Sequence, residues 1–263
     1  GNVKTAMTAI IKKDFRGVTD NKHLFASLLI VPLVLTIVLP STFLVMIHFA
    51  PDDPDIQRLL DLLPQSMQTK GLEQGLAELV LNFMLPVFFL IIPIMSASIM
   101  AASSFVGEKE KHTLETLLYC PLSVRRIFRA KVLASFLLSM MVSLISFCAM
   151  MAVLELESWI LMGTLLIPSI SWLVILLLLA PSISLIAVTL IVRRSAKAQS
   201  VEESQQSAVF LVIPVILMIV GQSTGLLLVS AWILLAFGLI CALLAWLLLK
   251  TCMGKFTYEM LLQ

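Results

Sequence analysis

Five long apolar runs, separated by short polar passages, limit what this chain can fold into. The first, residues 24–49, holds about 26 residues without an Asp, Glu, Lys or Arg, enough for a helix to cross a hydrocarbon core about 30 Å thick. The other runs cover residues 79–106, 132–154, 159–192 and 208–249. Only 13% of the residues are charged and 60% are hydrophobic, which excludes a soluble globular domain. We therefore predict a single all-α transmembrane domain.

The last two runs are too long to cross the membrane only once each. Residues 159–192 would extend about 51 Å as one helix, so we expect Pro168 or Pro181 to break the run, with residues 159–168 at the outer interface. Residues 208–249 would extend about 63 Å, and the segment between Gly221 and Gly225 is expected to turn the chain back. The prediction is six spans, at residues 24–49, 79–106, 132–154, 171–192, 208–221 and 226–249.

Orientation follows from the positions of Lys and Arg, because cytoplasmic loops carry an excess of both. Sixteen of the 18 lie in residues 2–23, 107–131, 193–207 and the tail at 250–263. Only Arg58 and Lys70 lie in residues 50–78, together with six acidic residues. Six spans with both termini in the cytoplasm satisfy this distribution and make residues 50–78 an outer loop.

The N-terminal segment, residues 2–23, has the pattern of a basic amphipathic helix, with Ala6, Ile10, Ile11 and Phe15 set against Lys12, Lys13 and Arg16. We expect an interfacial helix that lies on the membrane before span one, anchored by its basic residues. A solvated helical leader is the alternative. At the start of span three, Arg125, Arg126, Arg129 and Lys131 are expected to reach lipid phosphates and fix the depth of that span.

Residues 107–131 form a strongly polar passage between two apolar runs. Gly107 is expected to end the preceding helix, and Glu108 and Glu110 to occupy the first turn of a new one, where negative charge suits the helix dipole. Leu114, Leu117 and Leu118 recur at helical spacing and predict one apolar face. Pro121 would end this short helix, and Ser123 would cap the next.

This passage resembles the ABC-2 family of ATP-driven transporter permeases. The matching positions are Glu108, Lys109, Glu110, Thr113, Glu115, Leu117, Leu118, Pro121, Ser123 and Lys131. Many members have a basic residue followed by Gly where this chain has Lys111 and His112, which leaves the local start of the helix open. The resemblance implies a cytoplasmic coupling helix between spans two and three that docks on an ATPase, with Glu108, Glu110, Lys111, His112, Thr113, Leu114, Glu115, Leu117 and Leu118 as the coupling residues.

The resemblance also implies the partners and the activity. Separate ABC ATPase subunits would bind ATP and Mg²⁺, and a second permease copy or a sister permease would complete the transport path. The expected function is export across the cytoplasmic membrane, in a prokaryote, by alternating access. The cargo classes that the resemblance allows include drugs, antimicrobial peptides, lipid-linked glycans and sodium ions.

Motifs for chemistry within this chain are absent from the sequence. There is no G-x-x-x-x-G-K-[ST], so the chain has no P-loop for ATP. The scattered His23, His48 and His112 and four cysteines without paired spacing predict neither a metal site nor a disulfide framework. Glu202 and Glu203 resemble the paired glutamates of some intramembrane proteases, but the partner residues are missing. We predict no catalytic residue, no cofactor and no nucleic-acid partner.

Two further features bear on function. The predicted spans carry no ionisable residue well inside the bilayer, which argues against the alternative of an ATP-independent channel or secondary carrier. A protease or a non-transporting interaction subunit ranks lower. Serines form stripes in spans two and three, at Ser96, Ser103, Ser135, Ser139, Ser143 and Ser146. Such stripes could line a substrate path, but the favoured interpretation is close helix packing.

Overall fold

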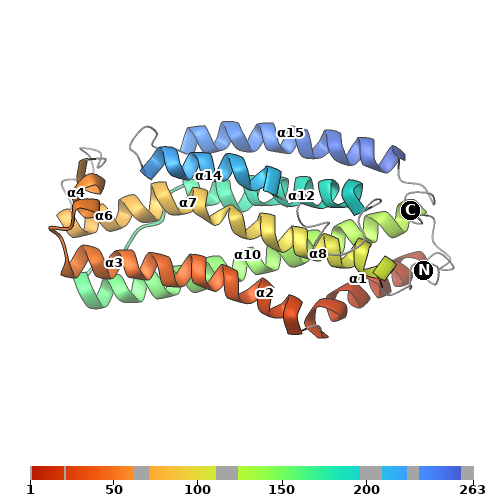
Figure 1. Ribbon diagram of the computed structural model, residues 1–263, viewed down its shortest axis with the longest axis horizontal. Coiled ribbons are helices and arrows are strands. Elements are labelled where there is room, and N and C mark those ends of the chain that lie inside the picture. The colour runs from red at the N-terminus through yellow and green to blue at the C-terminus, as the bar shows by residue number, and fades with distance from the viewer. Residues whose placement is uncertain are drawn as a thin grey trace.

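The computed structural model describes residues 2–20, 22–61, 71–110, 124–195, 209–223 and 231–255, and within them all regular secondary structure is helical. Most of the helices run along the long axis of an elongated bundle (Figure 1). In chain order they are α1 (Asn2–Asp20), α2 (Lys22–Leu33), η1 (Val34–Val38), α3 (Leu39–Phe49), α4 (Pro54–Asp61), α6 (Leu72–Leu79), η2 (Val80–Met84), α7 (Leu85–Phe89), α8 (Ile91–Glu110), α10 (Val124–Met162), α11 (Ser171–Val174), η3 (Ile175–Leu179), α12 (Ala180–Ser195), α14 (Val209–Ser223) and α15 (Ala231–Lys255), where η marks a π-helical turn.

Five helical stretches are long and apolar enough to cross a membrane: Ile30–Phe49, Leu72–Ser104, Arg126–Met162, Ser171–Arg193 and Ala231–Thr251. A shorter apolar stretch, Val212–Gly221, lies in α14. The prediction of an all-helical multi-pass membrane protein is therefore confirmed, and a sixth crossing by α14 remains a prediction.

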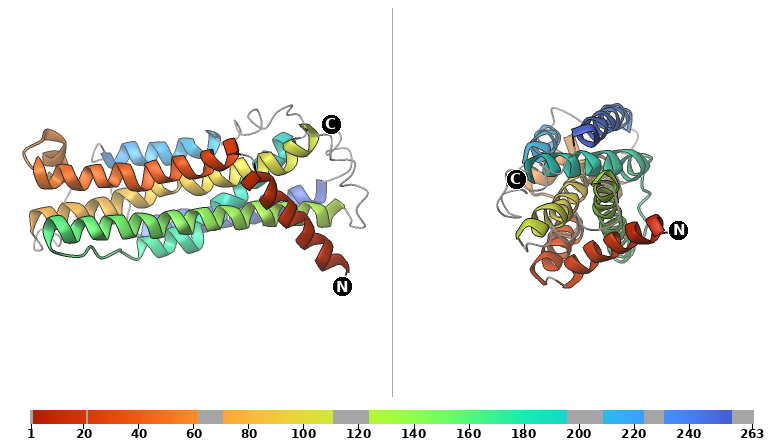
Figure 2. Two further views of the ribbon diagram at one scale, coloured as in Figure 1. Left: turned by 90° about the horizontal axis from the view of Figure 1, so that it is seen from below. Right: turned by 90° about the vertical axis from the view of Figure 1, so that its right-hand side faces the viewer.

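Different helices lie at the two ends of the bundle. α1, the last turn of α8, the first turn of α10 and the end of α15 lie at one end, and α4 lies at the other (Figure 1). Seen from below and along the long axis, α1 is set at an angle across the other helices rather than parallel to them (Figure 2). The segment that was expected to lie on lipid therefore crosses the end of the bundle and packs on it.

Each π turn stands at the same distance from a proline. η1 precedes Pro40, η2 precedes Pro86 and η3 precedes Pro181, and in every case one residue lies between the turn and the ring. A proline inside a helix has no N–H and clashes with the carbonyl four residues earlier. The residue before each ring instead donates its N–H to the carbonyl five residues back, as Leu39 does to Val34 and Leu85 to Val80. The extra residue widens the turn and lets the helix continue past the ring.

Several helices continue past residues that were expected to end them. α8 runs through Gly107 to Glu110, so Glu108 and Glu110 lie in its last turn rather than in the first turn of a new helix. Glycine makes a helix less stable by about 1 kcal/mol relative to alanine but does not stop it. α10 likewise continues past residue 154, the predicted end of span three, and runs through Glu155 and Glu157 to Met162, because glutamate is a good helix former. Gly163, with a φ of 72°, is the residue that ends it.

The non-helical connection between α10 and α11 is held by side chains. Asn82 donates to the carbonyl of Ile167 at 3.0 Å and accepts from the N–H of Ser169 at 2.8 Å. Glu155 accepts from the N–H of Leu166 at 3.0 Å, and the indole of Trp172 donates to the Leu81 carbonyl at 3.0 Å. Irregular backbone near a membrane needs such partners, because lipid supplies none.

Spans two and four form the centre of the bundle. In the most apolar 18 residues of each helix, 72% of residues are buried in Leu72–Ser104 and 61% in Ser171–Arg193. In Ala231–Thr251 the share is only 22%. At the centre, the rings of Phe89 and Trp172 meet edge to face at 5.4 Å between centroids. The outer helix α15 leaves large apolar side chains such as Trp232, Ile240 and Leu243 exposed, as expected of a surface that faces lipid.

A prediction concerns Gly238, where α15 packs on η3. A Cβ at this position would lie 2.5 Å from Cδ2 and 2.8 Å from Cγ of Leu178. We expect Gly238→Val to force α15 away and to lower the free energy of unfolding by about 1–3 kcal/mol. Thermal unfolding in detergent, followed by size-exclusion chromatography, measures this. The control is Gly17→Val, because a Cβ at Gly17 meets nothing within 4 Å; equal losses in the two variants would contradict the packing.

Candidate functional site

The expected coupling residues lie only partly within the described chain. Glu108 and Glu110 belong to the last turn of α8, and α10 begins at Val124. Lys111, His112, Thr113, Leu114, Glu115, Leu117 and Leu118 lie outside the described residues, as do Pro121 and Ser123. The structure nevertheless places both helices that flank this connection at the end of the bundle where α1 lies (Figure 1).

The basic residues expected at the membrane surface separate into two groups. Lys12, Lys13 and Arg16 on α1 and Arg126 and Arg129 on α10 are exposed. Arg125 lies in the first turn of α10, and its side chain is outside the described part. Lys131 differs from the expectation: it is only 2% exposed and points into the protein rather than toward headgroups.

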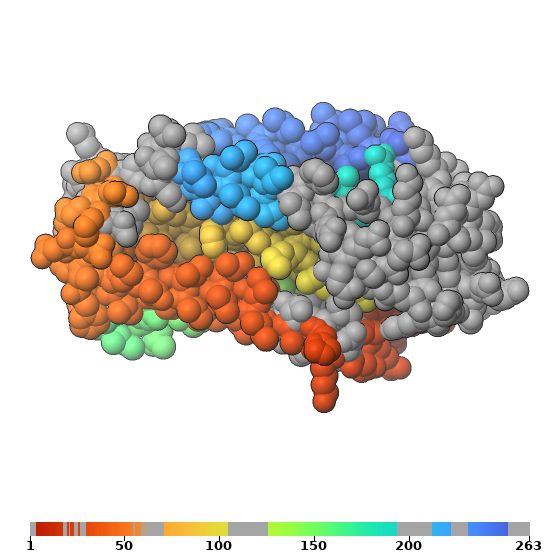
Figure 3. Space-filling view, in the orientation of Figure 1, coloured from red at the N-terminus to blue at the C-terminus, as the bar shows by residue number. Residues whose placement is uncertain are grey.

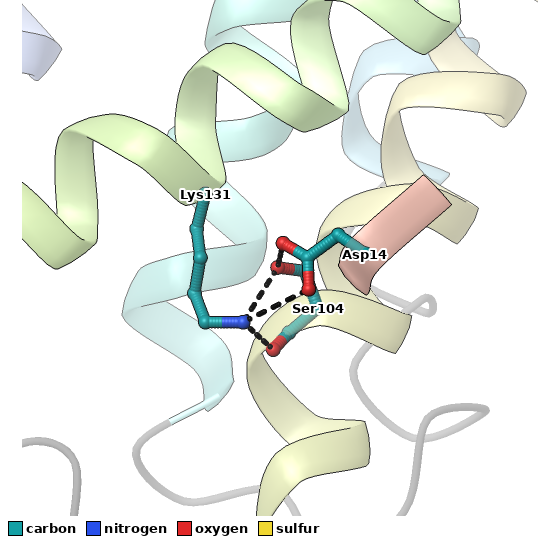
Figure 4. A network of polar contacts seen from close by, with 3 residues as sticks. All are labelled: Asp14, Ser104 and Lys131. Carbon is teal, nitrogen blue, oxygen red and sulfur yellow. Dashed lines mark hydrogen bonds and ion pairs between the residues drawn. The ribbon is translucent and has the colours of Figure 1, made fainter. Parts of the chain in front are cut away.

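Lys131 is held by a small polar network (Figure 4). Its Nζ donates to Oδ1 of Asp14 at 3.2 Å, to the carbonyl oxygen of Ser104 at 2.8 Å and to Oγ of Ser104 at 3.1 Å. The Ser104 hydroxyl in turn donates to the second carboxylate oxygen of Asp14 at 2.7 Å. The ammonium group thus has an acceptor for each of its three hydrogens, and both oxygens of Asp14 accept.

This network brings together α1, α8 and α10. A buried ion pair contributes little net stability compared with a well-packed apolar pair, but removal of one partner typically costs about 3–5 kcal/mol because the other charge remains buried. The described side chains of α1 include only two that are buried, Ile10 and Asp14. α1 is therefore fixed to the bundle by an apolar face centred on Ile10, to which Ala6, Met7 and Ile11 contribute, and by one buried ion pair.

Sequence reasoning missed Asp14, although a signal was present. Asp14 follows Ile10 by four residues and so falls on the apolar face of the amphipathic helix, where an acid needs a partner. Its partner lies 117 positions away along the chain, and no local pattern connects the two. Lys131 and Glu78 are also buried, at 2% and 3% exposed, and each lies just outside a span predicted from the sequence, near one end of a candidate span. That no ionisable residue lies well inside the bilayer remains a prediction.

The serines of the two predicted stripes mostly lie between helices. Ser139 is fully buried, and its hydroxyl lies 3.1 Å from that of Ser96 on α8 and 3.0 Å from that of Ser184 on α12. Ser135, Ser143 and Ser146 are also buried, whereas Ser103 is half-buried. The hydroxyls of Ser135 and Ser143 have no hydrogen-bond partner within the described part of the chain. These contacts join three helices and support the packing interpretation.

An apolar groove opens on the side of the bundle. Figure 3 shows α7 and α8 recessed between α3 and α14. A cavity of about 190 Å³ lies there, and its walls come from three spans. The lining residues are Leu39, Phe43, Val80, Met84, Leu85, Phe88 and Ile219. Such a surface can hold an apolar molecule or an acyl chain, but it offers no group for acid–base chemistry.

At the end of the bundle opposite α1, two glutamates have polar partners. Nδ1 of His48 lies 3.3 Å from Glu73, and the amide of Gln74 lies 3.5 Å from Glu78. Among the described residues no group of three or more His, Cys, Asp or Glu side chains could hold a metal ion. Glu202 and Glu203 lie outside the described chain.

Long apolar helices, an irregular connection sealed by side chains and a lateral apolar groove define a multi-pass membrane protein. The family model described as "ABC-2 family transporter protein" matches residues 53–231, which is more than half of the chain. The chain therefore belongs to the ABC-2 transporter family, as residues 107–131 predicted. Members are non-catalytic membrane subunits that work with ABC ATPase subunits. No curated protein and no solved structure matches this chain.

A prediction distinguishes a serine whose hydroxyl is hydrogen-bonded from a serine whose hydroxyl has no partner in the described part of the chain. Ser139→Ala removes the hydroxyl that joins Ser96 and Ser184, and we expect it to lower the free energy of unfolding by about 1 kcal/mol. Ser135→Ala removes a buried hydroxyl without a partner and should be neutral or slightly stabilising. Thermal unfolding of the two variants in detergent tests the difference. The reverse order would contradict the packing role of Ser139.

Proposed function

We propose that this chain is the membrane-spanning half of an ABC exporter, driven by separate ATPase subunits in the cytoplasmic membrane of a prokaryote. The observation that carries the proposal is the family match over residues 53–231. The placement of the basic residues agrees with it: Lys12, Lys13, Arg16, Arg126 and Arg129 lie at the end of the bundle where α8 ends and α10 begins. By the excess of Lys and Arg, that end faces the cytoplasm, with six spans and both termini inside.

The coupling helix at residues 108–118 is the proposed contact with the ATPase. Leu114, Leu117 and Leu118 would bury their apolar face in the partner, while Glu110, His112 and Glu115 make polar contacts. Closure of the ATPase dimer on ATP would push this segment and tilt the helices on both sides of it. Such a rigid-body movement switches a transporter between its inward and outward states.

The lateral groove supports the proposal that a second permease chain completes the transport path. Its cavity lies on the surface of the bundle between α3, η2, α7 and α14, and one chain leaves it open on one side (Figure 3). A second copy or a sister permease facing this groove would enclose a path lined by apolar side chains. We propose that the cargo, or an apolar part of it, passes along this face. The exposed basic residues would bind lipid headgroups and hold the depth of the spans.

The second candidate is a carrier driven by an ion gradient. It is favoured by Lys131 and Glu78, which are buried within candidate spans, since ionisable groups inside a membrane often couple transport to ions. Lys131 and Asp14, however, satisfy each other and Ser104. A carrier of this kind would need no ATPase, so the two candidates give opposite results in one experiment.

That experiment is affinity purification of the full chain from its native cells in mild detergent. We expect a P-loop ATPase to be recovered in equal amount with the wild-type chain and to be lost with Leu114→Asp, because a charge on the apolar face of the coupling helix prevents docking. The matched control is Leu72→Asp, which makes the same change at an exposed residue of the predicted outer face. It should retain the ATPase.

Two outcomes would contradict the proposal. A chain that purifies alone and moves solute in liposomes without ATP would favour the gradient-driven carrier. Loss of the ATPase from both leucine variants would mean that the contact does not depend on residues 108–118.

A further inference from the structure

The network of Asp14, Ser104 and Lys131, which we name the clamp, joins three segments that are distant in the sequence (Figure 4). Asp14 comes from α1, Ser104 from α8 and Lys131 from α10. Lys131 is 2% exposed and Asp14 8% exposed, so neither charge has access to water that could replace its partner. The three segments are therefore tied together by polar groups that are almost completely shielded from water.

The position of the clamp along α8 and α10 is informative. Ser104 lies about two turns before the end of α8 at Glu110, and Lys131 lies about two turns after the start of α10 at Val124. These two ends flank residues 111–123, which contain most of the proposed coupling helix. A movement of that connection therefore acts first on the end of α8 and the start of α10. The clamp lies about two helical turns from each of these ends.

α1 is held to the bundle by the clamp and by an apolar face to which Ala6, Met7 and Ile11 also contribute. Ile10 is the other buried side chain among the described residues of α1, and it packs with Ile127, Phe128 and Ala130 of α10. Lys12, Lys13 and Arg16 are exposed on the outer side of α1. After one residue the chain continues into α2 at Lys22, and then into span one. Fixing α1 to α8 and α10 therefore fixes the cytoplasmic end of span one as well.

We propose that Asp14 is a positioning residue for energy coupling, and that the clamp makes α1, the end of α8 and the start of α10 a single rigid lever. The proposal rests on the proposed function, in which an ATPase pushes the connection between α8 and α10. The lever carries spans one, two and three together relative to α14. Because Leu39 and Phe43 of span one and Ile219 of α14 line the same groove, this movement changes the width of the groove.

The first test measures whether Asp14 holds α1, and it needs no partner. In a cysteine-free full-length chain, spin labels replace two exposed residues, Lys12 on α1 and Arg129 on α10. We expect a narrow distance distribution in the unmodified background and a broad one in Asp14→Ala. Asp20→Ala, at an exposed aspartate of the same helix, is the matched control and should leave the distribution narrow. An unchanged distribution in Asp14→Ala would overturn the clamp.

Lys131→Met provides a second variant, in case Asp14→Ala fails to fold. It removes the buried cation instead of the anion and should release α1 in the same way. A narrow distribution in this variant would also overturn the clamp, because the apolar face of α1 would then be enough to hold the helix.

The second test uses the complex purified with its native ATPase. A second label pair, at the exposed residues Val45 on α3 and Leu217 on α14, reports the width of the groove. Trapping with ATP and vanadate should shift the Val45–Leu217 distance and leave the Lys12–Arg129 distance unchanged. In Asp14→Ala the ATPase should remain bound, while most of the shift across the groove is lost. If Asp14 had only a structural role, Asp14→Ala would reduce ATPase binding and the shift of the Val45–Leu217 distance together.

The outcomes separate this inference from the proposed function. A change in the Lys12–Arg129 distance on trapping would overturn the rigid lever while leaving ATP-driven transport intact. If neither distance responds to ATP and vanadate, the proposed function fails, and the Asp14→Ala comparison in the chain alone still decides whether the clamp exists.

Discussion

The hydrocarbon layer offers no hydrogen bonds, so each backbone N–H and C=O of a spanning segment must find its partner within the protein. The rest of this structure depends on that constraint. Three spans contain a proline that removes one donor, and each widens into a π turn ahead of the ring, at η1, η2 and η3. Where the chain leaves helical structure after α10, Asn82 and Glu155 supply the missing partners to the connection. At these three prolines the helix therefore continues with the N–H before the ring still paired.

Polar side chains inside the bundle also need partners within the protein, and the contacts they make differ in strength. The hydroxyls of Ser96, Ser139 and Ser184 join three helices by short neutral contacts, which permit close approach and are individually weak. Asp14 and Lys131 carry full charges, and each is costly to bury without the other. The serines therefore serve packing, whereas the ion pair determines where α1 lies. One network is spread along the spans, and the other is concentrated beside the connection that the ATPase is proposed to push.

This arrangement relates the groove to the proposed source of movement. The groove lies in the half of the bundle nearer α4, between span one, span two and α14, and the clamp lies at the opposite end beside α1. Helices transmit displacement along their length when their cytoplasmic ends are tied together. If the clamp ties spans one to three into one body, a push at residues 111–123 moves two walls of the groove relative to the third. The ATPase would then act on the cargo path without contacting it.

The sequence by itself determined the class of protein and the family, and it predicted the number and direction of the spans, because hydrophobic length, Lys and Arg counts and a local motif are all readable along the chain. It located the prolines and the serine stripes but not the π turns. It also misjudged where α8 and α10 end, since neither Gly107 nor Glu155 is strong enough to stop a helix that packing supports. Only the tertiary structure paired Asp14 with Lys131 and formed the groove. Both depend on contacts between segments far apart in the chain, and local propensity and periodicity carry no information about which distant residues meet.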